Sequence, residues 1–401
     1  MPVLDRVAAI QKDIVEWRRD LHAHPELGFE ENRTATFVAE QLRAFGCDEV
    51  TTGVGKTGVV AVIRGNHAVP DGRTKVIGLR ADMDALPIHE TTNLPYASKH
   101  EGVMHACGHD GHTAMLLGAA KCLSQDRDFA GTVVLIFQPA EEIGAGAIAM
   151  LEDRLMDRFE IEQIYGMHTL PGLPIGTIGI RAGAVMAATD SIEIRIEGRS
   201  GHPGRAHLAI DAIMVTAQLL NSLQQITSQN VNALEAANMT FQEIHGGGTH
   251  RVIAEKVELR GSLRTLSPDV HQLIKNRVRE VASGVALASG ARIDVKFEPD
   301  HGCVYNSPAQ TAVALTAAQE IVGNNIEETP PTLLGEDFAT MSQVRPGTFV
   351  FCGNGDSAAL HHPSFDFNDE SAAYGTSYWL SLVEKILGED TFRVAQPSRI
   401  V

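Results

Sequence analysis

Residues 132–142 read TVVLIFQPAEE, an apolar run that ends in a proline and two adjacent carboxylates. A continuously apolar run is typical of a strand that is covered on both faces, as in a parallel sheet. The same pattern occurs at residues 75–84, KVIGLRADMD, and at residues 163–168, QIYGMH. Helical patterns separate these strands, so the sequence predicts an α/β domain with a mixed, mostly parallel sheet. The strand ends carry polar groups to one edge of that sheet: Asp82, Glu141, Glu142 and His168.

The segment between the first two of these strands, residues 104–112, reads MHACGHDGH. It holds a thiol and three imidazoles, which are good ligands for zinc-like divalent metals. Cys107 and His109 are one residue apart, so in a loop that leads into a helix both can turn toward one ion. The alternative is a buried turn with capping histidines. His112 is expected to support a ligand or to cap the apolar helix predicted over residues 113–124.

A second kind of pattern begins after Ala184. Residues 191–197, SIEIRIE, alternate strictly, which indicates a strand with one wet face. Helical patterns at 208–229 and 268–288 alternate with strand patterns near 239–244, 256–264 and 292–297. This β-α-β-β-α-β order predicts a ferredoxin-like α+β unit inserted into the first domain. The expected boundaries are 1–186 and 299–401 for the main domain, and 187–298 for the insert.

Composition limits the class of partner. The net charge of −17 and the lack of clustered Lys and Arg argue against nucleic-acid binding, so a small substrate is expected. Five cysteines without framework spacing favour a reducing compartment. Residues 4–21 predict one amphipathic helix that is too charged for a signal segment, and no apolar run would span a bilayer. The sequence therefore predicts a cytoplasmic protein that acts without a membrane.

Taken together, these stretches resemble the M20 metallopeptidase family, and more narrowly its amidohydrolase branch of hippurate hydrolases, N-acyl-amino-acid amidohydrolases and auxin-conjugate hydrolases. The likeness covers essentially the whole chain. It is carried by motifs in the expected order, which here read WRRDLHAHPE (17–26), LRADMDALP (79–87), MHACGHD (104–110), QPAEE (138–142), GMH (166–168), GH (201–202) and GEDF (335–338).

The resemblance implies a catalytic domain with an inserted lid that also mediates dimerisation, giving a homodimer or a dimer of dimers. It also implies a site for two divalent ions, with zinc, manganese, cobalt and nickel all open. By position, the ligands are Cys107, His109, Glu142, His168 and a late histidine. That histidine is assigned to His361, with His362 as the fallback. Asp82 becomes an orienter of a ligand imidazole.

The implied reaction is metal-dependent hydrolysis of the amide bond of N-acyl or N-aroyl amino acids. Two ions about 3.5 to 4 Å apart can share a water and lower its pKa toward about 7. By resemblance, Glu141 is the general base beside this bridging hydroxide and later passes the proton to the leaving nitrogen. His202 on the lid is expected to reach the partner subunit's site and stabilise the oxyanion. Arg264 matches a lid position that can hold a substrate carboxylate.

One departure from the family bears on substrate choice. Residues 251–254 read RVIA where the family usually has an asparagine followed by Val-Ile-Pro. One hypothesis is that Arg251 selects a second negative charge on the substrate, because guanidinium pairs bidentately with carboxylate. A drifted specificity for another amide is equally compatible. Two further functions remain open: a dipeptidase or other C–N hydrolase on the same site, and a non-catalytic metal-binding scaffold.

Overall fold

The computed structural model describes residues 3–68 and 75–388, and within it the chain divides into two compact units. The first unit comprises residues 1–183, 305–330 and 340–401 as far as they are described, and the second comprises 184–304 and 331–339. The late segment 331–339 therefore packs with the inserted unit, a return of the chain that the sequence patterns did not indicate.

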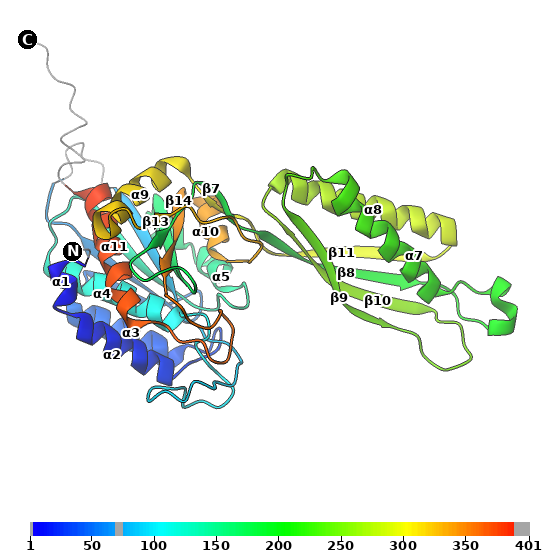
Figure 1. The fold of residues 1–401 in the computed structure, drawn as a ribbon, viewed down its shortest axis with the longest axis horizontal. Coiled ribbons are helices and arrows are strands. Elements are labelled where there is room, and N and C mark those ends of the chain that lie inside the picture. The colour runs from blue at the N-terminus through cyan, green and yellow to red at the C-terminus, as the bar shows by residue number, and fades with distance from the viewer. Residues whose placement is uncertain (1–2, 69–74, 389–401) are drawn as a thin grey trace, which may run out of the picture. The chain divides into compact units, whose positions relative to one another are not determined.

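The first unit is built on an eight-stranded mixed sheet, ordered β1-β2-β4-β3-β5-β14-β6-β13 (Figure 1). Neighbours from β4 through β3 and β5 to β14 run parallel, whereas β1, β2 and β4 pair antiparallel. The mostly parallel sheet is thus confirmed. Its strands are β1 (Glu49–Val54), β2 (Gly58–Arg64), β3 (Val76–Asp82), β4 (Thr132–Gln138), β5 (Gln163–Leu170), β6 (Ile178–Gly179), β13 (Ile326–Glu327) and β14 (Gly347–Gly353).

One buried helix organises the packing around this sheet. Helix α4 (His109–Gln125) contacts β3, β4 and β5, and nearly all of its side chains are buried. Helices α2, α3 and α11 pack on it in turn, so its apolar residues meet protein on every side. The helices of this part of the chain are α1 (Asp5–Ala8), α2 (Gln11–Ala23), α3 (Asn32–Phe45), α5 (Gly146–Glu152), α6 (Leu155–Arg158), α9 (Pro308–Val322), α10 (Phe338–Val344) and α11 (Asp369–Leu387).

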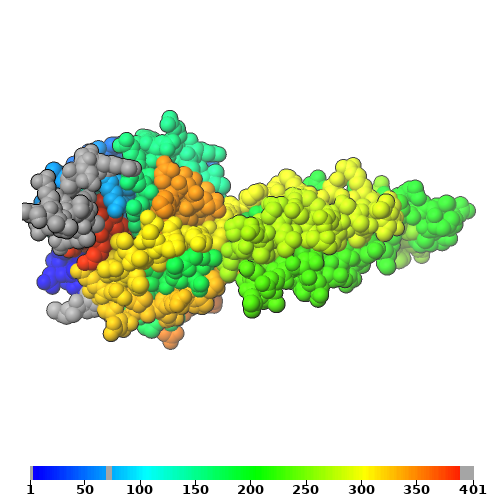
Figure 2. Space-filling view, turned by 90° about the horizontal axis from the view of Figure 1, so that it is seen from above, coloured from blue at the N-terminus to red at the C-terminus, as the bar shows by residue number. Residues whose placement is uncertain are grey.

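The second unit is a four-stranded antiparallel sheet, ordered β11-β8-β10-β9, with helices α7 and α8 side by side on one face (Figure 1). The predicted β-α-β-β-α-β insert is confirmed. Figure 2 shows residues of both helices forming the surface of this unit. Its elements are β8 (Ala188–Glu197), η1 (Pro203–Leu208), α7 (Ala212–Gln225), η2 (Ile226–Asn230), β9 (Ala237–Gly246), β10 (Lys256–Thr265), α8 (Pro268–Ser289) and β11 (Arg292–His301). Strands β7 (Gly183–Met186) and β12 (Val304–Asn306) pair where the chain passes between units.

Several local predictions were wrong. The single N-terminal helix is two helices, because α1 ends at Ala8 and α2 begins at Gln11. The single helix over 208–229 is replaced by η1, α7 and η2. Helix α4 begins at His109, not at Thr113. Gly108 adopts φ 90° directly before it, so the helix starts within residues 104–112, the stretch that holds the candidate metal ligands. Among the described residues, no helix combines the length and the apolar character that crossing a bilayer requires.

Candidate metal centre

Four loops and strand ends at one edge of the parallel sheet bring the predicted ligands together. Registered pairing places Asp82 beside Gln138 and His168 beside Phe351, so β3, β4, β5 and β14 end at the same edge. The chain after β4 carries Glu141 and Glu142, and the loop after β14 carries His361. The backbone N–H of His361 donates to the carbonyl oxygen of Ala106 at 2.8 Å, which ties this loop to the segment that carries Cys107.

The first group of converging atoms comprises Cys107, His109 and His168, whose donor atoms lie within 4.8 Å of one another. The Sγ atom of Cys107 lies 3.3 Å from Nε2 of His168, and all three side chains are buried. His168 comes from the end of β5, whereas Cys107 and His109 flank the left-handed Gly108 at the start of α4. A residue with a side chain would not fit at position 108, because its Cβ would lie only 2.5 Å from Cγ2 of Thr169.

A second group comprises Cys107, Glu142 and His361, also within 4.8 Å, so Cys107 belongs to both. Nε2 of His361 lies 3.5 Å from Oε2 of Glu142, and Nε2 of His109 lies 3.8 Å from Oε1 of Glu142. The nearer oxygen of Glu141 is 4.0 Å from Nε2 of His109. Both histidines are exposed, but Nδ1 of His362 accepts the backbone N–H of Ser364. The geometry therefore favours His361 over His362.

The hydrogen bonds of the histidines fit a metal site. Nδ1 of His109 lies 2.9 Å from the carbonyl oxygen of Asp84, so in the neutral ring that nitrogen carries the proton and Nε2 has a lone pair. His168 repeats this arrangement, because its Nδ1 lies 2.6 Å from the carbonyl oxygen of Thr169. Nε2 of His109 and Oε1 of Glu142 are buried without a hydrogen-bond partner among the described residues. Buried polar atoms of this kind call for a partner, and a cation satisfies them.

The pKa values of Cys107, Glu142 and His168 are also consistent with a metal site. Burial raises the pKa of Glu142 to about 7 and holds the pKa of the Cys107 thiol well above its usual range. Burial also holds the pKa of His168 well below its usual range, so that imidazole stays neutral. A bound cation would favour the thiolate, the carboxylate and the neutral imidazole together, which are the forms that bind metal.

Asp82 and His112 form a further group with His109, and the donor atoms of the three side chains lie within 4.8 Å of one another. One oxygen of Asp82 lies 2.6 Å from Nδ1 of His112, and the other accepts from Arg80 at 2.7 Å. Nε2 of His112 accepts the backbone N–H of Thr169 at 2.9 Å. Both ring nitrogens of His112 are therefore engaged with protein, as the expected supporting role requires. The same hydrogen bonds leave Asp82 oriented toward the histidines at the site.

The other predicted site residues belong to the second unit. His202 is exposed, and its Nδ1 accepts the backbone N–H of Gly204 at 3.0 Å. Arg264 is half-buried on β10 and donates from Nη1 to the carbonyl oxygen of Leu333 at 2.9 Å. Arg251 is exposed in a turn with φ 73°, a left-handed conformation. The structure does not place these three side chains relative to the metal cluster.

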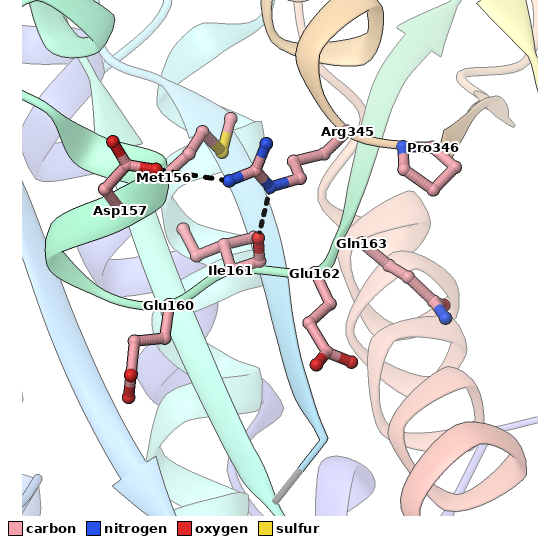
Figure 3. Close-up of a pocket in the computed structure, with 8 residues that line it drawn as sticks. All are labelled: Met156, Asp157, Glu160, Ile161, Glu162, Gln163, Arg345 and Pro346. Atoms are coloured by element: carbon pink, nitrogen blue, oxygen red, sulfur yellow. Dashed lines mark hydrogen bonds and ion pairs between the residues drawn. The ribbon is translucent and has the colours of Figure 1, made fainter.

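A separate surface hollow lies at the opposite edge of the sheet, where β5 and β14 begin (Figure 3). Arg345 fills part of it, with Nε donating to the carbonyl oxygen of Ile161 at 2.7 Å and Nη2 lying 3.3 Å from Oδ1 of Asp157. This hollow is remote from the strand ends that carry the metal cluster. Its lining is Met156, Asp157, Glu160, Ile161, Glu162, Gln163, Arg345 and Pro346.

Two buried carboxylates near the cluster were not recognised from the sequence as part of the site. Asp84 ends the quoted stretch 75–84, and neither it nor Glu31 was assigned a role from the sequence. Both accept backbone N–H groups of the loop that carries Glu141 and Glu142. Every residue except proline has a backbone N–H, so the sequence does not indicate which of these donors a buried carboxylate accepts.

Comparisons with known proteins give the same picture. Residues 78–385 match the model of peptidase family M20/M25/M40. The chain is 38% identical over 382 residues to the N-acetylcysteine deacetylase of Bacillus subtilis, which covers 94% of this chain and 98% of that protein. It is 36% identical over 389 residues to the hippurate hydrolase of Campylobacter jejuni, covering 96% and 100% respectively. A crystal structure of a dinuclear metal-binding M20 peptidase from Bacillus subtilis matches with a TM-score of 0.84 and 36% identity, covering 95% of this chain and 99% of that one.

Proposed function

This chain is a metal-dependent amidohydrolase of peptidase family M20/M25/M40, and we propose that it cleaves the amide bond of N-acyl or N-aroyl amino acids. Both named relatives, the N-acetylcysteine deacetylase and the hippurate hydrolase, act on an acyl group joined to an amino acid. The observation that carries the proposal is the convergence of a buried thiol, three imidazoles and a carboxylate next to Glu141. We expect the reaction to take place in the cytoplasm.

The proposed ligands of two divalent ions are Cys107, His109, Glu142, His168 and His361. Cys107 belongs to both groups of converging donors, so its thiolate would be available to either ion. When bound, such ions supply an activated water and polarise the substrate carbonyl. Histidine, thiolate and carboxylate suit zinc, manganese, cobalt and nickel, and the donor set alone does not choose among them.

Glu141 is the proposed general base. It follows Glu142 directly, and one of its oxygens lies 4.0 Å from Nε2 of His109, at the rim of the ligand cluster. The carboxylate takes a proton from the attacking water and then gives it to the leaving nitrogen, so that the amine departs uncharged. Asp82 assists by orienting the histidines on its side of the cluster.

His202 is proposed to stabilise the oxyanion in the site of a partner subunit, which makes a homodimer the active form. Because its Nδ1 accepts a backbone N–H, the neutral ring carries its proton on Nε2. That N–H is exposed and can donate to an oxyanion. A single subunit would then lack this donor, and a dimer of dimers would supply it equally well.

Two arginines of the inserted unit are proposed to read the amino-acid part of the substrate. Arg264 uses one N–H on Leu333, and a guanidinium has four more donors for a carboxylate. Arg251 is exposed and is proposed to select a second negative charge. Comparison of kcat/KM for N-acyl-aspartate and N-acyl-leucine tests this selection, and absence of any preference for the diacid would remove Arg251 from the proposal.

Release of acid from hippurate and from N-acetyl-methionine, with each of the four metals, tests the proposed function. We expect hydrolysis that depends on added metal. Glu141→Gln should bind metal as the wild type does and lose about 10²- to 10⁴-fold in kcat. Glu26→Gln is the control, since Glu26 lies outside the cluster and should leave turnover unchanged. A protein that binds metal but cleaves dipeptides alone would be a dipeptidase, and one that cleaves neither would be a scaffold.

A further inference from the structure

Exposed basic side chains gather on two paired segments of the inserted unit, residues 198–210 and 249–255. An antiparallel bridge joins the segments, in which the N–H of Ile253 donates to the carbonyl oxygen of Gly201 at 2.9 Å. Glu255 is the one acidic residue in these two stretches of sequence. Together the exposed basic residues form what is here named the basic strip: Arg199, His202, Arg205, His207, His250 and Arg251.

Two arginines of the basic strip have no counter-charge. The side chains of Arg205 and Arg251 form neither an ion pair nor a hydrogen bond with any residue that the structure describes. Other exposed arginines of the same unit differ, since Arg195, Arg260 and Arg292 each lie within 3.8 Å of two carboxylates. In a chain of net charge −17, an exposed guanidinium without a carboxylate is free to bind an anion from outside the protein.

Arg251 also has a backbone conformation that an arginine rarely adopts. Its φ of 73° lies in the left-handed region, in the turn that the N–H of Val252 closes on the carbonyl oxygen of Thr249 at 3.2 Å. Glycine and asparagine adopt this conformation at a lower cost. Residues held in such conformations cluster at functional sites and at sites that bind ligands. The strain at Arg251 is thus explained by a role of its side chain and not by the needs of the turn.

The pairing of the two segments brings both arginines near His202. Antiparallel chains run in opposite directions, so the residues after Gly201 lie beside those before Ile253. The N–H of Arg205 donates to the carbonyl oxygen of His202 at 2.7 Å, which keeps Arg205 within one turn of that histidine. Adjacent antiparallel segments lie about 5 Å apart, and an arginine side chain spans more than that distance. Both guanidinium groups can therefore reach one anion next to His202.

We infer that Arg205 and Arg251 together bind the side-chain carboxylate of the substrate, which makes N-acyl derivatives of aspartate and glutamate the substrate class. The inference rests on the proposed function, and it adds Arg205 as a second specificity-determining residue beside Arg251. Arg264 is assigned to the α-carboxylate, so each carboxylate of an acidic amino acid has its own partner. A guanidinium binds a carboxylate through two parallel hydrogen bonds, which sets both its direction and its strength.

Three variants separate this role from a structural one. Arg205→Gln and Arg251→Asn each remove one guanidinium, and Arg260→Gln is the control, because it makes the same change in net charge on the same unit but outside the basic strip. Arg251→Asn should leave the thermal midpoint of unfolding unchanged or higher, since asparagine adopts a left-handed conformation more readily. A purely structural role of Arg251 would instead lower that midpoint.

The values of kcat/KM for N-acetyl-aspartate, N-acetyl-glutamate and N-acetyl-leucine test the inference. The wild type should prefer at least one diacid over N-acetyl-leucine by about 10- to 100-fold, as expected for hydrogen bonds to a charged group. Arg205→Gln and Arg251→Asn should each lower this ratio by about fivefold or more, and the double variant should bring it close to one. Arg260→Gln should keep the ratio within about twofold of the wild type.

A wild type with no preference for either diacid would overturn the inference, and so would a ratio that survives in the double variant or falls equally in Arg260→Gln. A loss confined to Arg251→Asn would refute the role of Arg205.

Failure of the proposed function is a separate outcome, because the wild type would then release no acid from any of the three compounds. Calorimetry with Mn²⁺-loaded Glu141→Gln still tests the inference in that case. N-acetyl-glutamate or N-acetyl-aspartate should bind about 10-fold or more tightly than N-acetyl-leucine, and this difference should disappear when Arg205→Gln and Arg251→Asn are added. Equal affinity for all three compounds would overturn the inference.

Discussion

Nε2 of His112 accepts the backbone N–H of Thr169 at 2.9 Å, and this hydrogen bond determines which nitrogen of the neutral ring carries the proton. Since Nε2 is an acceptor, the neutral ring carries its proton on Nδ1, which donates to Asp82. His112 thereby links the end of β3 to the residue that follows His168 on β5. Both of its ring nitrogens are hydrogen-bonded to protein, so it supports the residues of the cluster and does not itself bind a metal ion.

Replacement of His112 should therefore be costly. His112→Leu would leave an oxygen of Asp82 and the N–H of Thr169 buried without these partners, a loss of about 2 to 6 kcal/mol at roughly 1 to 3 kcal/mol for each group. His105 is the control, because its ring is buried but neither nitrogen has a hydrogen-bond partner among the described residues. His105→Leu should cost less than about 1 kcal/mol. Urea unfolding of the metal-free variants measures both, and equal losses would contradict the assignment.

Arg18 and Arg19 bind the same carboxylate, so they allow the stability contributions of a buried and an exposed arginine to be compared. Nε of Arg18 donates to Oδ1 of Asp369 at 2.8 Å, and Nε of Arg19 donates to Oδ2 of the same carboxylate at 2.9 Å. The Arg18 side chain is 1% exposed and the Arg19 side chain 47%. Arg18→Met should therefore cost about 3 to 5 kcal/mol, because it removes a buried guanidinium from beside three carboxylates, those of Asp110, Asp366 and Asp369.

Arg19→Met should cost less than about 1 kcal/mol, as an exposed ion pair is screened by water. Guanidinium-chloride unfolding would mask part of this difference through its ionic strength, so urea is the better denaturant. If the two variants were equally destabilised, the distinction between the buried and the exposed member of the pair would fail.

Asp190 in the second unit should make stability depend on pH in the acid range. Burial alone would raise its pKa, but the hydrogen bonds from His271, at 3.0 Å, and from Lys275 outweigh burial and lower it. A carboxyl whose pKa is lower in the folded state stabilises the protein above its unfolded pKa of about 3.9. That contribution is lost as the pH falls through the lower, folded value.

The free energy of unfolding of the wild type and of Asp190→Asn should thus differ by about 1 to 2 kcal/mol near pH 6 and converge below pH 4. Asp294 on β11 is the control, since its pair with Arg292 is exposed. Asp294→Asn should follow the wild type within about 0.5 kcal/mol at every pH. A constant gap between wild type and Asp190→Asn down to pH 2 would contradict the expectation.

Metal removal should lower the thermal midpoint. An ion present at 100 times its dissociation constant stabilises the folded state by about 2.7 kcal/mol if it does not bind the unfolded chain. Addition of Mn²⁺ to chelator-treated protein should therefore raise the midpoint in the wild type and in Glu26→Gln. Glu142→Ala should show little or no such rise, because it removes a proposed ligand. A midpoint unaffected by metal in the wild type would argue against the site.

The sequence by itself determined where the central strands end and which polar side chains follow them. Residues 75–84, 132–142 and 163–168 combine an apolar run with a terminal polar group, and a strand buried on both faces leaves no other place for that group. The alternating pattern after Ala184 likewise determined the inserted unit, since period-2 and period-3.6 patterns are local properties of the chain.

Only the tertiary structure decided how the cluster is supported. His361 rather than His362 points to Glu142 because the loop after β14 is tied to Ala106, far away in the sequence. The roles of Asp84, Glu31 and His112 depend on backbone N–H groups of distant segments. Every residue except proline has such a group, so which one a buried side chain meets is set by packing and leaves no trace in the order of residues.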